Sequence, residues 1–208
     1  MAVLVKDNLT TDLALAFATD SWAATATKFT TAINDYIQTA SVIEIPIAGA
    51  WTAFPNTAGL ALGICKATTD ALSVTALGTA CTTAFALPAW TGVSALISTA
   101  ISTVLTTATV ALTSYAVITV PPPPPIYTLG GVGVATASIT VAPADIIDLA
   151  SKINTAFTTG TDWKVVASDI ATAVDDFIKT AIVTTIPSPG GSLPVAWTGL
   201  GGDIGGFK

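Results

Sequence analysis

The sequence contains no histidine and no arginine, and only 10% of its 208 residues are charged. Histidine is the commonest general base and the commonest metal ligand in proteins. Without it, most hydrolase and metalloenzyme sites cannot be built. We therefore expect a protein that is not an enzyme and that has no catalytic residues, no cofactor and no metal site.

Positive charge is also scarce. The seven basic residues are all lysines, thirteen residues are acidic, and the formal net charge is −6. Proteins bind nucleic acids mainly through lysine and arginine contacts to phosphate, and arginine makes the commonest specific base contact. We therefore expect no binding to DNA or RNA.

Cysteine is limited to Cys65 and Cys81, too few for a zinc site. A chain of this size needs no disulfide to fold, so two buried thiols are the expected state and a disulfide is the alternative. The first seven residues lack the basic and long apolar regions of a signal peptide, so we do not expect secretion by that route.

The tryptophans reveal an internal repeat. When Trp22, Trp90 and Trp163 are aligned without gaps, bulky apolar residues and Thr-Ala pairs recur at the same distances after each of them. At position +7 the residues are Phe29, Ile97 and Ile170, and at position +20 they are Val42, Val110 and Val183. An alanine- and threonine-rich composition does not by itself bring bulky residues into register. The pattern predicts three copies of one unit.

Each copy reads as two helices. Apolar residues spaced by four lead up to a phenylalanine, and a heptad-like stripe follows each tryptophan. The short turn between the two stripes makes the helices antiparallel. The predicted helices span residues 9–18, 22–42, 76–86, 91–114, 147–158 and 163–183. The predicted structural anchors are Phe17, Trp22, Phe85, Trp90, Phe157 and Trp163.

The predicted fold class is mainly α, with three tandem helical hairpins that can be related by approximate threefold symmetry. The corresponding units are residues 1–58, 59–130 and 131–208. Proline ends each second helix, at Pro46, at the run from Pro121 to Pro125 and at Pro187, and a glycine-rich stretch follows. These connections are predicted to be irregular loops. None of the glycine stretches completes a nucleotide-binding motif.

The middle copy has lost its charged face. Its second helix carries uncharged side chains where the other copies have charges such as Asp35 and Lys179, namely Leu96, Ser102, Thr103 and Thr106. Unpaired charges are costly away from water, whereas serine and threonine can bond their own backbone. We therefore predict that another protein covers this face. Trp51 and Trp197, both within Ala-Trp-Thr in the expected loops, either plug the hairpin ends or extend the interface.

A membrane offers another explanation for the missing charges. Residues 93–120 are uncharged and long enough to cross a bilayer of about 30 Å. Their many serines and threonines, and the charges on the equivalent helices, argue against insertion. A membrane-active or pore-forming protein with a hydrophobic central hairpin remains the alternative function, and a binding module with an unnamed ligand is a third.

The threonine- and alanine-rich style, the opening Asn8-Leu-Thr-Thr-Asp-Leu-Ala and the repeated Thr-Ala-Ile/Val helix resemble virion structural proteins of tailed bacteriophages. The resemblance lies in amino-acid composition and in repeat layout over most of the chain. It implies a structural subunit of the capsid, neck, tail or baseplate. Its expected partners are other structural subunits in a homo- or hetero-oligomeric assembly, and its expected location is the virion, with assembly in the host cytoplasm.

Overall fold

The computed structural model describes residues 5–39, 41–51, 54–117, 130–185, 189–190, 197–199 and 204–206. Side chains are described for residues 5–39, 69–109 and 138–184. Two of the three places where proline was expected to end a helix lie outside the described residues, namely the run from Pro121 to Pro125 and Pro187.

The described chain is mainly helical, as predicted. Its six helices are α1 (Lys6–Phe17), α2 (Trp22–Thr39), α3 (Ala71–Phe85), α4 (Trp90–Thr107), α5 (Pro143–Thr159) and α6 (Trp163–Thr180). Each second helix stops before its predicted end. The ends predicted at residues 42 and 183 lie three residues from the observed ones, within the two to four residues allowed for boundaries, whereas the end predicted at residue 114 was wrong because α4 stops at Thr107. Beyond these helices the chain is rich in β-branched residues, which favour strands over helices.

Polar side chains near the helix starts explain several of the boundaries. The Asp70 carboxylate accepts a hydrogen bond from the backbone N–H of Ser73 at the start of α3. The Asp162 carboxylate accepts bonds from Lys164 and Val165 at the start of α6. The Ser21 hydroxyl accepts a bond from Ala24 in α2. Such caps satisfy backbone donors that have no partner within the helix.

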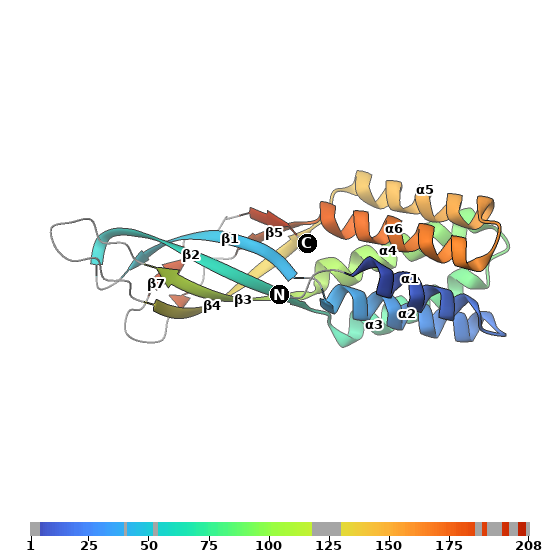
Figure 1. Cartoon of the computed structure of the whole chain (residues 1–208), viewed down its shortest axis with the longest axis horizontal. Helices are drawn as coiled ribbons and strands as arrows, with labels where there is room; N and C mark the ends of the chain where they lie inside the picture. The colour runs from blue at the N-terminus through green and yellow to red at the C-terminus, as the bar shows by residue number, and fades with distance from the viewer. Residues whose placement is uncertain are drawn as a thin grey trace.

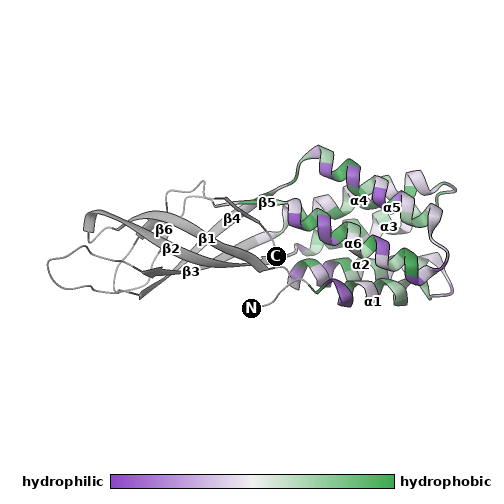
Figure 2. Cartoon of the chain, turned by 45° about the horizontal axis from the view of Figure 1, so that its top comes forward, coloured by the Kyte–Doolittle hydropathy of each residue, from purple (hydrophilic) through white to green (hydrophobic). Residues whose placement is uncertain are grey.

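The helices form one bundle in which three of them are more deeply buried than the others. Helices α2, α4 and α6 bury eight or nine residues each, whereas α1, α3 and α5 bury four or five. Helix α1 packs against α2 and α6, α3 against α2 and α4, and α5 against α4 and α6. The innermost side chains, exposed by 1% or less, include Leu9, Leu13, Phe29, Ile33, Ile97 and Ile101. Figure 2 shows polar and apolar residues alternating along the helices, as expected of amphipathic helices that share one core.

The segments between the hairpins contain strands, so the prediction of irregular Pro/Gly-rich loops was wrong. The strands are β1 (Ser41–Trp51), β2 (Phe54–Thr68), β3 (Thr109–Val117), β4 (Gly130–Thr140), β5 (Ile182–Thr185), β6 (Pro189–Gly190), β7 (Trp197–Gly199) and β8 (Ile204–Gly206). They form one antiparallel sheet in the order β6-β7-β1-β2-β3-β4-β5-β8. The connections leave the bundle as one strand and return as the next.

Proline and glycine fit into this sheet at particular places. Pro46 lies in β1 next to an irregularity in the pairing with β2, and β7 pairs only with the far end of β1, from Gly49 to Trp51. At Pro46, the edge of β1 that faces away from β2 is therefore not paired with β7. Proline has no backbone N–H, and an unpaired strand edge tolerates that absence. Gly49 faces Gly59 on one side and Gly199 on the other.

The molecule is elongated, with the bundle at one end and the sheet at the other (Figure 1). The sheet curls, because β8 contacts β1 and β6 contacts β4 although neither pair is adjacent in the strand order. The helix turns at residues 18–21, 86–89 and 160–162 lie at the end of the bundle far from the sheet. Two surfaces of the bundle concern function: this turn end, and the outer face of the middle hairpin.

Candidate functional site

The six predicted anchors meet at the turn end of the bundle. The rings of Phe17, Phe85 and Phe157, from α1, α3 and α5, form a triangle with centroid separations of 6.4, 5.8 and 6.3 Å. All three are buried, at 5%, 5% and 8% exposure. Edge-to-face contacts of this kind add to the energy of burial. The three phenylalanines are therefore core residues at this end.

Each tryptophan stacks on a phenylalanine of another hairpin. Trp22 lies on Phe85 at 5.4 Å, Trp90 on Phe157 at 4.5 Å, and Trp163 on Phe17 at 5.3 Å. The third stack joins the last hairpin to the first.

The tryptophans are less buried than anchors were expected to be. Trp22 keeps 43% and Trp163 keeps 42% of its surface exposed, whereas Trp90 is partly buried against the core. Because so much of their area stays in water, these two indoles contribute less burial energy than a core tryptophan would. They cover the phenylalanine triangle and also present aromatic surface to the outside.

Three of the four predicted interface residues on α4 are exposed. Leu96 keeps 38% of its surface in water, and Thr103 and Thr106 are also exposed. Ser102 is different, because it is only 7% exposed and faces the interior of the bundle. Leu96, Thr103 and Thr106 thus lie on the exposed surface of α4, and their role as an interface stays a prediction.

Most exposed threonines of this hairpin have hydroxyl donors that are already bonded. Eight of them donate their hydroxyl hydrogen to the backbone carbonyl four residues earlier, namely Thr75, Thr79, Thr82, Thr83, Thr99, Thr103, Thr106 and Thr107. A buried polar group is costly mainly when its hydrogen bond is left unmade. Another protein could therefore bury these eight side chains while every one of their hydroxyl donors keeps its hydrogen bond.

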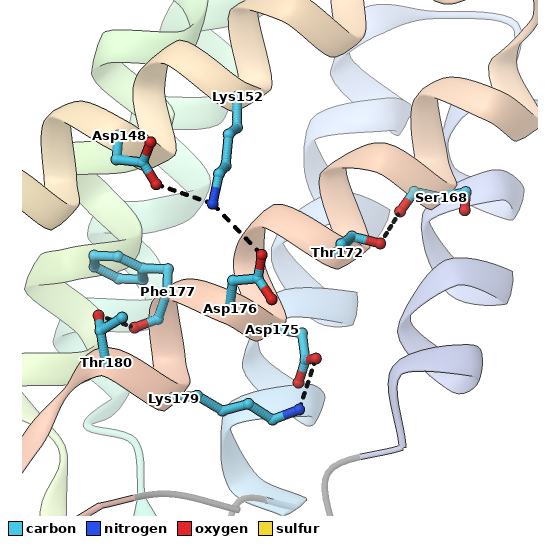
Figure 3. A network of polar contacts seen from close by, with 9 residues as sticks. All are labelled: Asp148, Lys152, Ser168, Thr172, Asp175, Asp176, Phe177, Lys179 and Thr180. Carbon is cyan, nitrogen blue, oxygen red and sulfur yellow. Dashed lines mark hydrogen bonds and ion pairs between the residues drawn. The ribbon is translucent and has the colours of Figure 1, made fainter.

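The third hairpin shows what the middle one lacks. The Lys152 ammonium on α5 contacts Asp148 at 2.9 Å and reaches Asp176 on α6 at 3.4 Å, as Figure 3 shows. Its bond to Asp148 raises the pKa of Lys152. The position of Asp176 is taken in the middle hairpin by Thr103. No charged residue occurs in the sequence between Asp70 and Asp145, so no such pair can form on α3 and α4.

The sequence did not indicate one buried polar contact. Asp175, expected on the solvent side, is only 6% exposed. Its carboxylate accepts a 2.6 Å hydrogen bond from the Tyr36 hydroxyl of α2 and a 2.8 Å bond from Lys179. Burial, together with Asp175, raises the pKa of Tyr36 well above its usual range. Tyr36 and Asp175 stand at different positions of the repeat, 14 and 12 residues after their tryptophans, and only the packing of the bundle brings them together.

Trp51 and Trp197 do not lie in irregular loops as predicted. They are strand residues of β1 and β7, and they are direct partners in the antiparallel pairing. Two tryptophans far apart in sequence therefore lie side by side in the sheet.

Several grooves run along the described bundle. One of about 510 Å³ between α2 and α3 is lined mostly by threonines. Grooves of about 290 Å³ lie between α1 and α2 and between α5 and α6. Cys81 is a buried free thiol, and burial raises its pKa to about 11. Among the described residues no group of three or more His, Cys, Asp or Glu could hold a metal ion.

The uncharged segment 93–120 is not one helix. Helix α4 ends at Thr107 and β3 begins at Thr109, while residues 118–120 lie outside the described part. None of the helices that the structure describes is long and apolar enough to cross a membrane.

Comparison with protein-family models, with curated proteins and with solved structures found no match to this chain.

Proposed function

We propose that the protein is a non-enzymatic structural subunit of a large assembly, and that the outer face of α3 and α4 is covered by another subunit. One observation carries the proposal. The exposed surface of α3 and α4 has no charged residue, and eight of its threonine hydroxyls are already bonded to the backbone of their own helices. Permanent interfaces are extensive and poor in charge at their centres.

The balance of costs favours protein as the covering partner. A face that stayed in water would gain solubility from charges like those on the third hairpin. A face that contacted lipid would favour leucine and isoleucine over threonine. Threonine with an internal hydrogen bond presents its methyl group and can be buried against protein without an orphaned donor.

We also propose that the three helical hairpins are tandem copies of one unit with approximate threefold symmetry. The three indole–phenyl stacks support this, because each joins one hairpin to the next and the last returns to the first. The proposed unit limits, 1–58, 59–130 and 131–208, remain a prediction. The first limit falls inside β2, so neighbouring units would share the sheet.

The assembly that best suits these features is the virion of a tailed bacteriophage. The resemblance in composition and repeat layout supports this assignment. The elongated shape of the molecule (Figure 1) and the uncharged surface of α3 and α4 also support it. Other structural subunits would be the partners, and the virion would be the location. A membrane-active protein is the alternative that the following experiment can reveal.

The test introduces charge into the proposed interface. Thr103→Asp with Thr106→Lys should leave the subunit folded, because both residues are exposed, and should strongly reduce its incorporation into particles. The matched control is Thr155→Asp with Thr158→Lys, which changes two exposed, internally bonded threonines of the same spacing on α5. Incorporation is measured as the amount of tagged subunit in purified particles relative to wild type.

Equal incorporation of both double variants would contradict the interface. Liposome flotation of the purified chain tests the alternative directly. Flotation that the α4 variant loses and the α5 variant keeps would favour a membrane-active protein instead.

A further inference from the structure

A small cavity opens at the turn end of the bundle, between the first hairpin and the last. Its volume is about 250 Å³. The α1–α2 turn forms one wall through Thr19, Asp20 and Ser21, and the remaining lining is Phe17, Trp22, Thr25 and Trp163. Small-molecule sites are typically concave and mostly apolar, with a few polar groups that set orientation. This cavity differs in balance, because its three aromatic rings are matched by four polar side chains.

Two exposed indoles provide its aromatic surface. The rings of Trp22 and Trp163 meet at 5.9 Å and at an interplanar angle of 84°. Phe85 covers one side of Trp22, and Phe17 covers one side of Trp163. The two indoles are therefore held rigidly by stacking beneath them, while more than 40% of each remains open to solvent. A ligand ring could stack there without having to order these side chains first.

Asp20 supplies a carboxylate that the fold does not use. In α2 the helix cap is the hydroxyl of Ser21, which accepts from Ala24 at 3.2 Å. The Asp20 side chain is exposed, and within the described part of the chain it accepts no hydrogen bond and makes no ion pair. It is thus available as a hydrogen-bond acceptor for a ligand.

The other two helix turns at this end of the bundle do not place an unpaired carboxylate beside two indoles. Pro88 stands at the position of Asp20 in the second hairpin, beside Leu87. In the third hairpin the neighbouring acid, Asp162, is engaged as the cap of α6. The free carboxylate next to two indoles therefore occurs at one corner, although all three corners share the stacked rings.

We propose that this cavity binds a single pyranose ring of a saccharide. A pyranose has an apolar face of C–H groups, which suits an indole surface, and a rim of hydroxyl donors, which suits the Asp20 carboxylate. The oxygens of Thr19 and Ser21 lie in the same wall. An organic cation is less well suited, because the indoles meet edge to face and do not enclose a methylammonium group from several sides. This inference does not depend on the proposed assembly role.

The test uses the full chain labelled with ¹⁵N, and follows the indole N–H signals by NMR. The probes are the methyl glycosides of glucose, galactose, mannose and N-acetylglucosamine, with choline as the cationic probe. Trp22→Phe and Trp163→Phe assign the two signals. At least one glycoside should shift both signals saturably, with a dissociation constant on the order of millimolar.

Asp20→Ala should then weaken binding about tenfold, since a hydrogen bond to a charged group is lost. Asp12→Ala is the matched control, because it removes an equally exposed carboxylate from α1 and should leave binding unchanged. Asp20→Asn keeps the shape and one acceptor, so it should weaken binding less than the alanine variant.

Three results would overturn the proposal. The first is the absence of any shift with all four glycosides up to tens of millimolar. The second is saturable binding of choline alone. The third is an Asp20→Ala variant that still folds and binds as tightly as Asp12→Ala.

Discussion

Gly160 shows how a single residue shapes the turn between α5 and α6. A Cβ atom at this position would lie 2.4 Å from the Val166 side chain and 2.7 Å from the Ala156 carbonyl oxygen. No real Cβ makes contacts this short, and the carbonyl belongs to a helix end that cannot easily move. Glycine is required here by space.

Gly160→Ala should therefore destabilise the protein by about 1–3 kcal/mol, the usual cost of overpacking. Chemical denaturation of the two proteins measures the difference. The matched control is Gly78→Ala in α3. A Cβ there would make only ordinary 3.8 Å contacts with Thr30 of α2. Alanine is the better helix former, so this change should stabilise by about 0.5–1 kcal/mol. Equal effects from both substitutions would contradict the described turn.

At the scale of elements, the buried bond between Tyr36 and Asp175 joins α2 to α6. These helices belong to the first and last hairpins, so the contact helps close the bundle. The equivalent positions on α4 are Ser102 and Val104, which cannot form such a pair. This polar link therefore joins two of the three inner helices and has no counterpart at the equivalent positions of the third, α4.

Removing this link should cost stability. Because Asp175 is buried, Asp175→Ala should cost about 2–3 kcal/mol, since it leaves the Tyr36 hydroxyl unpaired. Tyr36→Phe should cost about 1–2 kcal/mol. The double variant should lose less than the sum, as for any contacting pair. Strictly additive losses, or a loss of the same size from the exposed control Asp176→Ala, would contradict the bond.

The helices were predictable from sequence and the strands were not. Helix periodicity is local. Apolar stripes such as those through Leu13 and Phe17 in α1 and through Ile33 in α2, with their counterparts in the other hairpins, were enough to locate six helices and the three turns between them. Strands depend on partners far away in sequence, such as Gly59 opposite Gly49. A signal existed in the β-branched run after Thr107 and in the glycine–valine alternation from Gly131 to Val134, but glycine and proline indicated loops more strongly.

At the scale of the whole molecule, the fold should lose stability in alkali. The pKa values of Tyr36 and Cys81 are both raised in the folded protein, chiefly by burial. The unfolded chain therefore releases these protons first. The stabilising effect is complete below the ordinary cysteine value of 9.0 and declines as the pH rises through about 11 for Cys81.

Urea denaturation between about pH 8 and pH 11 measures this loss, which should reach about 2 kcal/mol for Cys81 alone. Cys81→Ala should flatten the decline in this range, and Tyr36→Phe should flatten it at higher pH. An Asp12→Ala control should leave the slope as in wild type. A wild-type protein whose stability is constant across this range would contradict the burial of both groups.

The candidate interface was predictable in part. The loss of charge around Leu96, Thr103 and Thr106 is visible in the sequence because equivalent positions can be compared between the three proposed copies. The burial of Ser102 and Asp175 was not, because both lie on the boundary of the apolar stripe, where helix packing decides which side chains turn inward. The open corner beside Asp20 was missed for a similar reason, since it joins a turn of the first hairpin to Trp163 of the last.

The sequence by itself determined the helical hairpins, their aromatic residues and the uncharged middle copy, because each depends on residue type and on spacing within one segment. Only the tertiary structure decided which ring stacks on which, which polar groups are buried, and that the connections pair into a sheet. Those features arise from contacts between segments far apart in the chain, whose energies no local pattern records.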